Sequence, residues 1–581
     1  MSTETSDFQT RWARFMNRFE ARRATWARPA TAFVSQPEPR AIGSYARGRQ
    51  LSAGNFVFAG TLIQAPTTGL WDLAAPDPAF RHEQHGFGWL DDLAAAGDGP
   101  ARKAAQKWTI EWIARYGNGT GPGWTPELTG RRLIRWVTHA LFVMNGMESA
   151  DTPRFMQSLG QQTLFLARRW KTSPPGLPRF EALTGMIYAG LSLEGMEAHV
   201  QPALAALARE CDSQIDDQGG LPTRNPEELL DVFTLLTWAA LALSEAGHTP
   251  GHAHWSAIER IAPTLRTLRH SDGGLARFHG GGRGLEGRLD SALATSGVKS
   301  RMTEGLAMGF ARLSAGRTSV IIDASIPPTG RASSDAHAST LAFELTSGRR
   351  PLIVNCGSGS SFGPEWRRAG RATPSHSTLV LANRSSSTLG TKGQASQWLQ
   401  DTPTDVPVDF TQASDGFRFQ AGHDGFKRAY GLTHVRRIEM TFDGRGIASE
   451  DMLLALDTPD KAQFDLAMDG TKLQGVPFDI RFHLHPDVDA SIDMGGNAVS
   501  LALKSGEIWI FRCDGTAEMS VEPSVFLEKV RLKPRASRQI VLTGRATKHA
   551  TRVRWSLAKA QETPVSIRDL AQEELDPLAE D

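Results

Sequence analysis

The sequence predicts a two-part chain: an N-terminal α/α toroid, in the form of an incomplete barrel, followed by a C-terminal antiparallel β-sandwich. The first observation is length, because 581 residues are too many for one hydrophobic core. The second is periodicity, since apolar residues recur at helical spacing in the first half and alternate in the second. The third is that the helical segments follow one another without a strand between them, which is typical of paired helices closed into a ring. We therefore predict a lead segment (1–45), a toroid (46–300) and a sandwich (301–581).

Each predicted helix carries one apolar stripe and commonly ends near Gly, Pro or Asn. In the lead segment, Trp12, Phe15 and Phe19 share one face of a short amphipathic helix, which we expect to pack on its own domain. Most of the 15 tryptophans fall in this half and are expected between helices. Trp89 and Trp124, near Gly, Pro or helix starts, are instead candidate platforms for sugar rings. The helical segments are 87–97, 102–117, 127–144, 154–170, 183–196, 200–215, 226–247 and 254–270.

Short alternating segments separated by turn residues predict the strands of the second half. Two of the turns, TSGRRP and KSGEI, suit tight hairpins. The glycine-rich stretch HGGGRGLEGRLDSAL (279–293) lies where the helical half ends, which predicts a hinge, a loop in the cleft between the domains, or both. The strand segments are 318–325, 339–345, 351–357, 377–383, 417–422, 433–442, 478–486, 498–515 and 538–544.

Composition narrows the classes of function. The net charge of +1 gives no general electrostatic reason to bind nucleic acid. The three cysteines, Cys211, Cys356 and Cys513, are far apart and show no CxxC pairing, which argues against a disulfide framework or a cysteine zinc site. We find no secretory signal or membrane span. We therefore expect a cytoplasmic protein, with the periplasm or cell envelope as the alternative.

The segment 333–383 contains the most informative residues. It predicts two strands joined by a tight turn, then a basic loop, then a third strand. His337 stands at the entrance of the first strand and His376 at the entrance of the third, and the loop between them contains Trp366 and Arg371. Two imidazoles beside guanidinium groups suit proton transfer on an anionic substrate.

These residues carry a family resemblance. The motifs HAxxLxFELxxGxxPLIxxxG (337–357) and WxxxxRxTxxHxTLV (366–380) resemble those of the heparinase II/III-like polysaccharide lyases. The segments HVRRIEM (434–440) and GGLPTRNPEELLDVFTLL (219–236) are similar to the same family. The resemblance implies the toroid and sandwich fold. It also implies cleavage of an acidic, uronate-containing glycan by β-elimination in the cleft between the two domains.

β-Elimination needs a group that neutralises the uronate carboxylate, a base that takes the neighbouring proton, and an acid for the leaving oxygen. The resemblance assigns neutralisation to Asn225 and Arg224, the base to His337 or His279, and the acid to Tyr430. The residues expected to contact substrate are Arg224, Arg283, Arg371, Trp366 and Trp124. Asn225 precedes Pro226 and equally suits a helix N-cap, and His337 equally suits a buried structural role.

Departures from the family pattern leave two other functions open. Gly220 and Leu221 stand where related lyases often carry Asn-His, and the helical tyrosine of the family has no match. The first alternative is therefore a catalytically depleted glycan-binding or polysaccharide-processing accessory protein. The second is a toroid glycoside hydrolase that uses two carboxylates, for which Asp216, Asp217 and Glu228 are candidates.

The resemblance also implies a structural divalent metal, zinc or calcium, in the β-domain of some relatives. The corresponding positions are His337, Asn355 and His376. Asn is a weak substitute for Asp because it brings no charge to the metal. No other cofactor is expected, and the sequence does not predict an oligomeric state.

Overall fold

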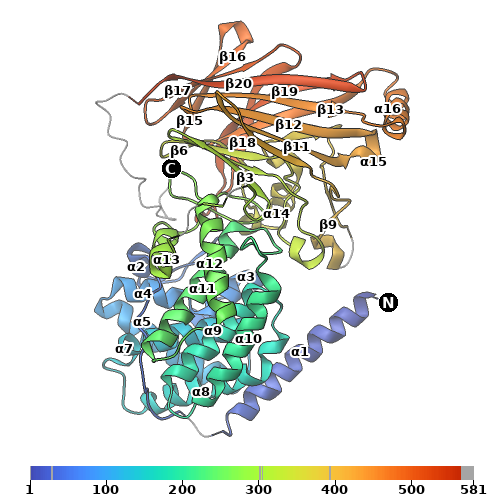
Figure 1. Cartoon of the computed structure of the whole chain (residues 1–581). Coiled ribbons are helices and arrows are strands. Elements are labelled where there is room, and N and C mark those ends of the chain that lie inside the picture. Colours follow the sequence, from blue (N-terminus) through green and yellow to red (C-terminus); the bar gives the residue numbers. More distant parts are fainter. Residues whose placement is uncertain (1, 28–29, 300–301, 304, 392–393, 564–581) are drawn as a thin grey trace.

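A computed structural model describes residues 2–27, 30–299, 302–303, 305–391 and 394–563. The helices form one body and the sheets a second body stacked on it, as Figure 1 shows. The prediction of a helical toroid followed by an antiparallel β-sandwich is therefore confirmed. Within the described residues no helix is long and apolar enough to cross a membrane. Cys211, Cys356 and Cys513 are free thiols.

The helical half contains α1 to α13. Their bounds are α1 Ser2–Ala24, α2 Tyr45–Ser52, α3 Pro78–Gly86, α4 Trp89–Ala96, α5 Gly99–Tyr116, α6 Pro126–Thr138, α7 Ala140–Met144, α8 Asp151–Arg169, α9 Leu177–Ser192, α10 Val200–Gln214, α11 Pro226–Glu245, α12 His252–Thr267 and α13 Arg288–Ser296. A short hairpin, β1 Asn55–Phe58 and β2 Thr61–Gln64, lies beside them.

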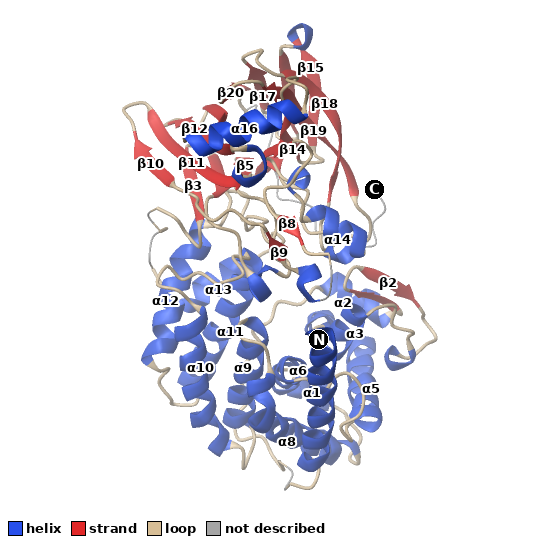
Figure 2. Ribbon diagram, turned by 90° about the vertical axis from the view of Figure 1, so that its right-hand side faces the viewer, coloured by secondary structure: helices blue, strands red, loops and turns tan. Residues whose placement is uncertain are grey.

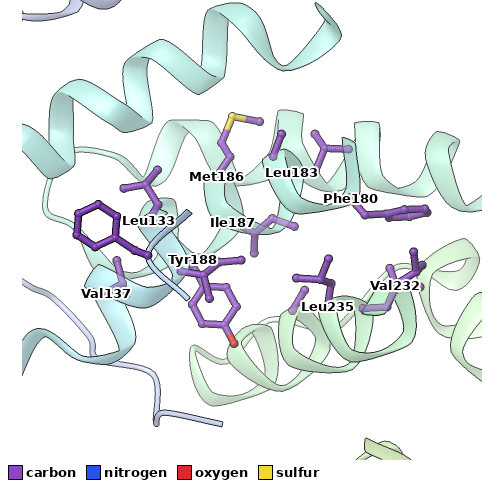
Figure 3. Close-up of a cluster of buried hydrophobic side chains, with 14 of the residues drawn as sticks. Leu133, Val137, Phe180, Leu183, Met186, Ile187, Tyr188, Val232 and Leu235 are labelled. Carbon is purple, nitrogen blue, oxygen red and sulfur yellow. The ribbon is translucent and has the colours of Figure 1, made fainter. Parts of the chain in front are cut away.

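Helices α6, α9 and α11 pack together at the centre of the helical body. Ile187 and Tyr188 of α9 lie between Leu133 of α6 and Leu235 of α11, and all four are buried (Figure 3). Gly130 and Gly185 allow α6 and α9 to approach closely, because a Cβ on Gly185 would lie 2.5 Å from the Gly130 Cα. The continuous apolar face of α9 is therefore explained by helices on both of its sides.

The β half contains β3 to β20 and three more helices. Their bounds are β3 Phe310–Ala315, β4 Thr318–Asp323, β5 Phe343–Ser347, β6 Arg350–Val354, α14 Pro364–Gly370, β7 Leu379–Leu381, β8 Thr388–Leu389, β9 Leu399–Gln400, β10 Val408–Gln412, β11 Gly416–Phe426, α15 Lys427–Tyr430, β12 Leu432–Thr441, β13 Gly446–Leu454, α16 Thr458–Gly470, β14 Val476–Leu484, β15 Val488–Asp493, β16 Ala498–Leu503, β17 Ile508–Cys513, β18 Glu518–Phe526, β19 Arg535–Ala546 and β20 Ala550–Gln561.

Two large antiparallel sheets form the sandwich. One has the order β10-β11-β12-β13-β20-β17-β16-β15, and the other β18-β19-β14-β6-β5-β4-β3, with β7 also paired to β14. Their inner faces meet at Phe343, Phe482 and Trp555, where the Phe343 and Trp555 rings stack with centroids 5.8 Å apart. Figure 2 shows both sheets above the helices, with α14 and the short strands β8 and β9 between the two bodies.

One expectation about aromatic residues needs correction. Trp12, Phe15 and Phe19 of α1 are 55%, 57% and 50% exposed, so the aromatic face of this helix does not pack on its own domain. Ala21 and Ala24 of the same helix are buried, and the contact with α8 is made on that side. The boundaries of the three predicted regions remain a prediction; α13 ends at Ser296 and β3 begins at Phe310.

Candidate functional site at the junction of the two bodies

His279 and His337 are joined by reciprocal hydrogen bonds to backbone groups. The His337 amide donates to Nδ1 of His279 at 3.1 Å, and the Gly280 amide donates to Nε2 of His337 at 3.1 Å. Both side chains are only 1% exposed. His279 itself has a φ of 47°, and this left-handed backbone turns the glycine-rich loop onto the β half. The loop therefore covers the two imidazoles that the sequence assigned as base.

The other face of this loop rests on the start of α11. Oδ1 of Asn225 accepts from the amides of Glu227 and Glu228, at 3.0 and 3.2 Å, which makes Asn225 the N-cap of the helix. Gly281 packs against the same oxygen, since a Cβ there would lie 2.5 Å from it. The structure thus supports the capping interpretation of Asn225, which uses the carboxamide oxygen. Its assignment to carboxylate neutralisation, which would use the carboxamide nitrogen, stays a prediction.

Glu227 connects the loop to the sandwich. Its Oε2 accepts from the Gly282 amide at 2.8 Å and from Nζ of Lys529 at 2.6 Å. Burial raises the pKa of Glu227, but Lys529 and the Gly282 amide more than offset this and hold it below the usual range. Sequence reasoning missed both residues. The only local signal for Glu227 was an acidic side chain in the first turn of a helix.

Replacing Gly281 by Ala is expected to displace the loop, because the new methyl group would overlap the Asn225 carboxamide. Overpacking of this kind costs roughly 1–3 kcal/mol. Hydrogen exchange of the Gly280 amide should become faster in Gly281→Ala. The matched control is Gly282→Ala, whose Cβ would meet Glu227 oxygens at an ordinary 3.4–3.5 Å. Equal protection of Gly280 in both variants would show that the loop is not held by this contact.

Arg224 and Asp323 form a buried ion pair beside His279. Nη2 of Arg224 donates to Oδ1 of Asp323 at 2.6 Å and to the Gly309 carbonyl at 2.9 Å. Ser339 donates to the other Asp323 oxygen at 2.7 Å. The guanidinium is fully engaged between the two bodies, so the structure corrects its assignment as a residue that contacts substrate. Asp323 was not predicted; a carboxylate inside a buried strand was its signal in the sequence.

The charges around Asp323 also affect His279. Burial lowers the pKa of His279, and the Asp323 carboxylate only partly opposes this. Burial raises the pKa of Asp323, but Arg224 and His279 outweigh it, so the pKa lies well below its usual range. The pair is therefore a neutral imidazole beside an ionised carboxylate at neutral pH.

His337, His376 and Asn355 lie together but form a poor metal site. The His337 and His376 rings are 4.9 Å apart between centroids, and Nδ1 of His337 and both nitrogens of His376 have no partner among the described residues. Oδ1 of Asn355, however, accepts from the Ser377 amide at 2.9 Å. In the described part of the chain no three His, Cys, Asp or Glu side chains are arranged to hold a metal. Two imidazoles and one carboxamide are fewer than the four ligands of a structural zinc site, and they lack the oxygens that calcium requires.

The other predicted substrate contacts divide into buried and exposed residues. Arg371 is buried and donates to the carbonyls of Ala336 and Ser333 at 2.8 and 2.7 Å, so it fixes the segment before His337 instead of facing a glycan. Trp124 is buried, and its Nε1 donates to the Tyr116 carbonyl at 2.8 Å. Both assignments are therefore corrected.

Arg283 and Trp366 have different surroundings. Arg283 is partly buried and pairs with Asp272 at 3.7 Å. Trp366 on α14 is 36% exposed and is the predicted contact that remains open to solvent. Tyr430 ends α15 and packs on the sandwich core. Figure 1 shows α15 beside α16 at the edge of the sandwich, away from α11. The structure thus does not bring Tyr430 together with Asn225, and its role as the acid is corrected.

Two of the carboxylates proposed for hydrolysis, Asp216 and Glu228, have different surroundings. Oδ1 of Asp216 accepts from the amides of Gln218 and Gly220 in a turn, at 2.9 and 2.7 Å. Glu228 is mostly buried in the first turn of α11, where burial first and then Asp231 and other carboxylates raise its pKa to about 7. Acidic groups therefore lie at this end of α11, and Glu227 and Asp231 among them are paired with Lys529 and Arg288.

The comparisons with known proteins agree with this geometry. The sequence profile described as Heparinase II/III-like, C-terminal, matches residues 297–556. FtsZ-localized protein C of Caulobacter vibrioides (strain NA1000 / CB15N) is 30% identical over 547 residues, which cover 92% of this chain and 91% of that protein. A heparinase III structure aligns with a TM-score of 0.67 at 11% identity, covering 96% of this chain and 91% of that one. A mutant heparan sulfate lyase HepC from Pedobacter heparinus aligns with a TM-score of 0.58 at 15% identity, covering 95% and 89%.

The helical toroid stacked on a two-sheet sandwich is the fold that this chain shares with the heparinase III and heparan sulfate lyase structures. The chain belongs to the heparinase II/III-like family.

Proposed function

We propose that this chain is a catalytically depleted member of its family, an accessory protein that handles an acidic polysaccharide without cleaving it. The observation that carries the proposal is the closed pair of His279 and His337. Each is bonded to the backbone beside the other, and each is 1% exposed. A base in β-elimination must come within hydrogen-bonding distance of a sugar proton, and neither imidazole can do so while the loop covers it.

The remaining candidates support the same proposal. Asn225 caps α11, Arg224 is paired with Asp323, and Tyr430 lies in a different part of the molecule. The assigned acid is therefore absent from the junction, and the assigned Arg224 is already engaged there. A fold can be retained while its chemistry is lost, so membership of the family does not by itself require lyase activity.

The relative from Caulobacter is named for its localisation with FtsZ. We extend this to the present chain and propose that it acts in the cytoplasm where FtsZ is located. Its proposed target there is a polysaccharide that the cell itself makes. Fluorescent fusions of this chain and of FtsZ should then colocalise. A uniform distribution of the fusion in cells with visible FtsZ assemblies would contradict this part of the proposal.

A lyase assay tests the proposal that the chain does not cleave acidic polysaccharides. Incubation with heparan sulfate, chondroitin and alginate should produce no ultraviolet absorbance from an unsaturated uronate, because no base reaches the sugar. A known polysaccharide lyase run on the same glycans serves as the positive control. An absorbance increase that disappears in His337→Ala would overturn the proposal.

A second candidate is an active lyase whose loop opens on binding substrate. It is favoured by one observation: Nδ1 of His337 and both ring nitrogens of His376 have no hydrogen-bond partner among the described residues. These nitrogens are available to a substrate once the loop opens. If Gly281→Ala gains activity that the parent chain lacks, closure of the loop is what suppresses the chemistry, and this second candidate is preferred.

A further inference from the structure

A cavity of about 300 Å³ lies in the helical body, and neither His279 nor His337 is part of its lining. It forms where α4 and α6 from the start of the toroid meet α11 and α13 from its end. The segment 38–42 crosses this seam and supplies part of the wall. We propose that this cavity, called here the seam pocket, binds one neutral sugar ring.

The apolar part of the pocket is an indole. Trp238 is half-buried in the middle of α11 and faces the seam pocket. A sugar ring has an apolar face of C–H groups, and a partly exposed tryptophan offers a flat apolar surface with a polar edge. Of the two Trp residues on α11 and α12, only Trp238 lines the cavity; Trp255 of α12 is 41% exposed on the outside.

Hydroxyl groups supply acceptors on the same wall. The Thr234 hydroxyl donates to the Leu230 carbonyl at 2.6 Å, and the Thr237 hydroxyl donates to the Phe233 carbonyl at 2.8 Å. Their donors are thus already used within α11, and their lone pairs remain as acceptors for sugar hydroxyls. Ser291 adds another hydroxyl from α13.

The charged side chains of the wall are the carboxylates Glu38 and Asp91 and three arginines, and each arginine has a carboxylate partner. Arg135 pairs with Asp91 at 3.0 Å and Arg288 with Asp231 at 2.6 Å. Arg40 pairs with Glu245, and its buried Nε has no hydrogen-bond partner among the described residues. A guanidinium beside a carboxylate offers donors and acceptors together, which suits the adjacent hydroxyls of a sugar.

This balance of charge determines the class of ligand. Because each arginine is already neutralised, the pocket offers no free cation for a uronate or sulfate. A volume of about 300 Å³ is at the lower end of small-molecule sites, so it fits a single ring and not a chain. The ligand is therefore a neutral hexose or N-acetylhexosamine, which distinguishes this site from a cleft for acidic polymers and makes it independent of the function proposed above.

The experiment compares two substitutions one turn apart on α13. Ser291 and Ala294 are both exposed, and only Ser291 lines the seam pocket. Saturation-transfer NMR and calorimetry with glucose, N-acetylglucosamine and glucuronic acid should detect one or both neutral sugars and not the acid. Ser291→Phe, which fills the cavity, should weaken the neutral sugar by at least about tenfold, whereas Ala294→Phe should change it by less than about twofold.

A second pair of variants tests whether a loss of sugar binding is only a consequence of impaired folding. Trp238→Leu should abolish the NMR transfer signal, and Trp255→Leu should leave it unchanged, with thermal unfolding recorded for each. The proposal is overturned if no neutral sugar binds, if glucuronic acid binds more tightly than glucose, or if Ser291→Phe and Ala294→Phe bind equally well.

Discussion

Replacing Asp451 by Asn is expected to lower the free energy of unfolding of the sandwich by about 3–5 kcal/mol, because it leaves a buried guanidinium without its counter-charge. Arg436 donates to both oxygens of Asp451, at 2.8 and 3.1 Å. His434 bonds to the same carboxylate at 2.7 Å, and Nε1 of Trp555 donates to it at 2.9 Å. Burial raises the pKa of Asp451, but Arg436 and His434 hold it well below its usual range.

This network also reaches the candidate site. Nη1 of Arg436 donates to the carbonyls of Leu341 and Ser377, at 2.8 and 2.9 Å, so it fixes the segments that carry His337 and His376. Calorimetry should show a melting temperature for the β half that is lower by about 10 °C in Asp451→Asn. The matched control is Glu450→Gln on the same strand, which alters a solvent-facing pair with Arg554 and should cost at most about 1 kcal/mol. A similar loss in both variants would show that the network is not the source of stability.

Lowering the pH from about 6.5 to 4 is expected to destabilise both bodies steeply. Burial lowers the pKa of His85 in the helical body to about 3 and that of His483 in the sandwich to about 4. Below the unfolded value of about 6.5 the unfolded chain takes up protons that the folded chain refuses, so stability falls as the pH falls. Each such histidine contributes about 1.4 kcal/mol for each pH unit until its folded pKa is reached.

Several other buried histidines also lower the stability of the folded chain as the pH falls. They are His82, His254, His279, His337, His376, His423 and His434, whose pKa values are all lowered by burial. Urea unfolding across pH 4 to 8 should therefore give a nearly constant free energy above pH 7 and a steep loss below 6.5.

His85→Gln tests one of these contributions. The substitution keeps an acceptor for Nε1 of Trp112, which donates to Nδ1 of His85 at 3.1 Å. The slope of stability against pH should then decrease by about 1.4 kcal/mol for each unit below pH 6.5. The difference between variant and parent at pH 8 serves as the baseline. An unchanged slope would mean that His85 does not exchange protons differently in the two states.

The fold could be predicted because the period of apolar residues changes between the two halves. The segments 200–215 and 226–247 correspond closely to α10 and α11, since each has an apolar face against a neighbouring helix. Strands β13 and β20 were not predicted. They are the central neighbours of one sheet, but their outward positions carry charged residues such as Glu450 and Arg554, and only alternate positions are buried.

The site was less predictable, because its arrangement depends on tertiary contacts. His279 lies among glycines, a composition typical of an exposed loop, yet the same glycines let the loop fold back over it. Tyr430 is next to a matched strand in the sequence, but position beside a strand does not determine which end of the sheet a residue occupies. Asn225 fitted both a cap and a catalytic role by residue type, and its hydrogen bonds in the structure show the capping role.

The dual contact of Glu227 has a mechanical consequence. One carboxylate holds the Gly282 amide of the covering loop and the Lys529 ammonium of the sandwich at the same time. Rotation of the sandwich relative to the helices must break the lysine contact, and lifting the loop must break the amide contact on the same oxygen. Changes in the interdomain angle and solvent access to the imidazoles are therefore expected as a single concerted motion, so small-angle scattering would report on the state of the covering loop.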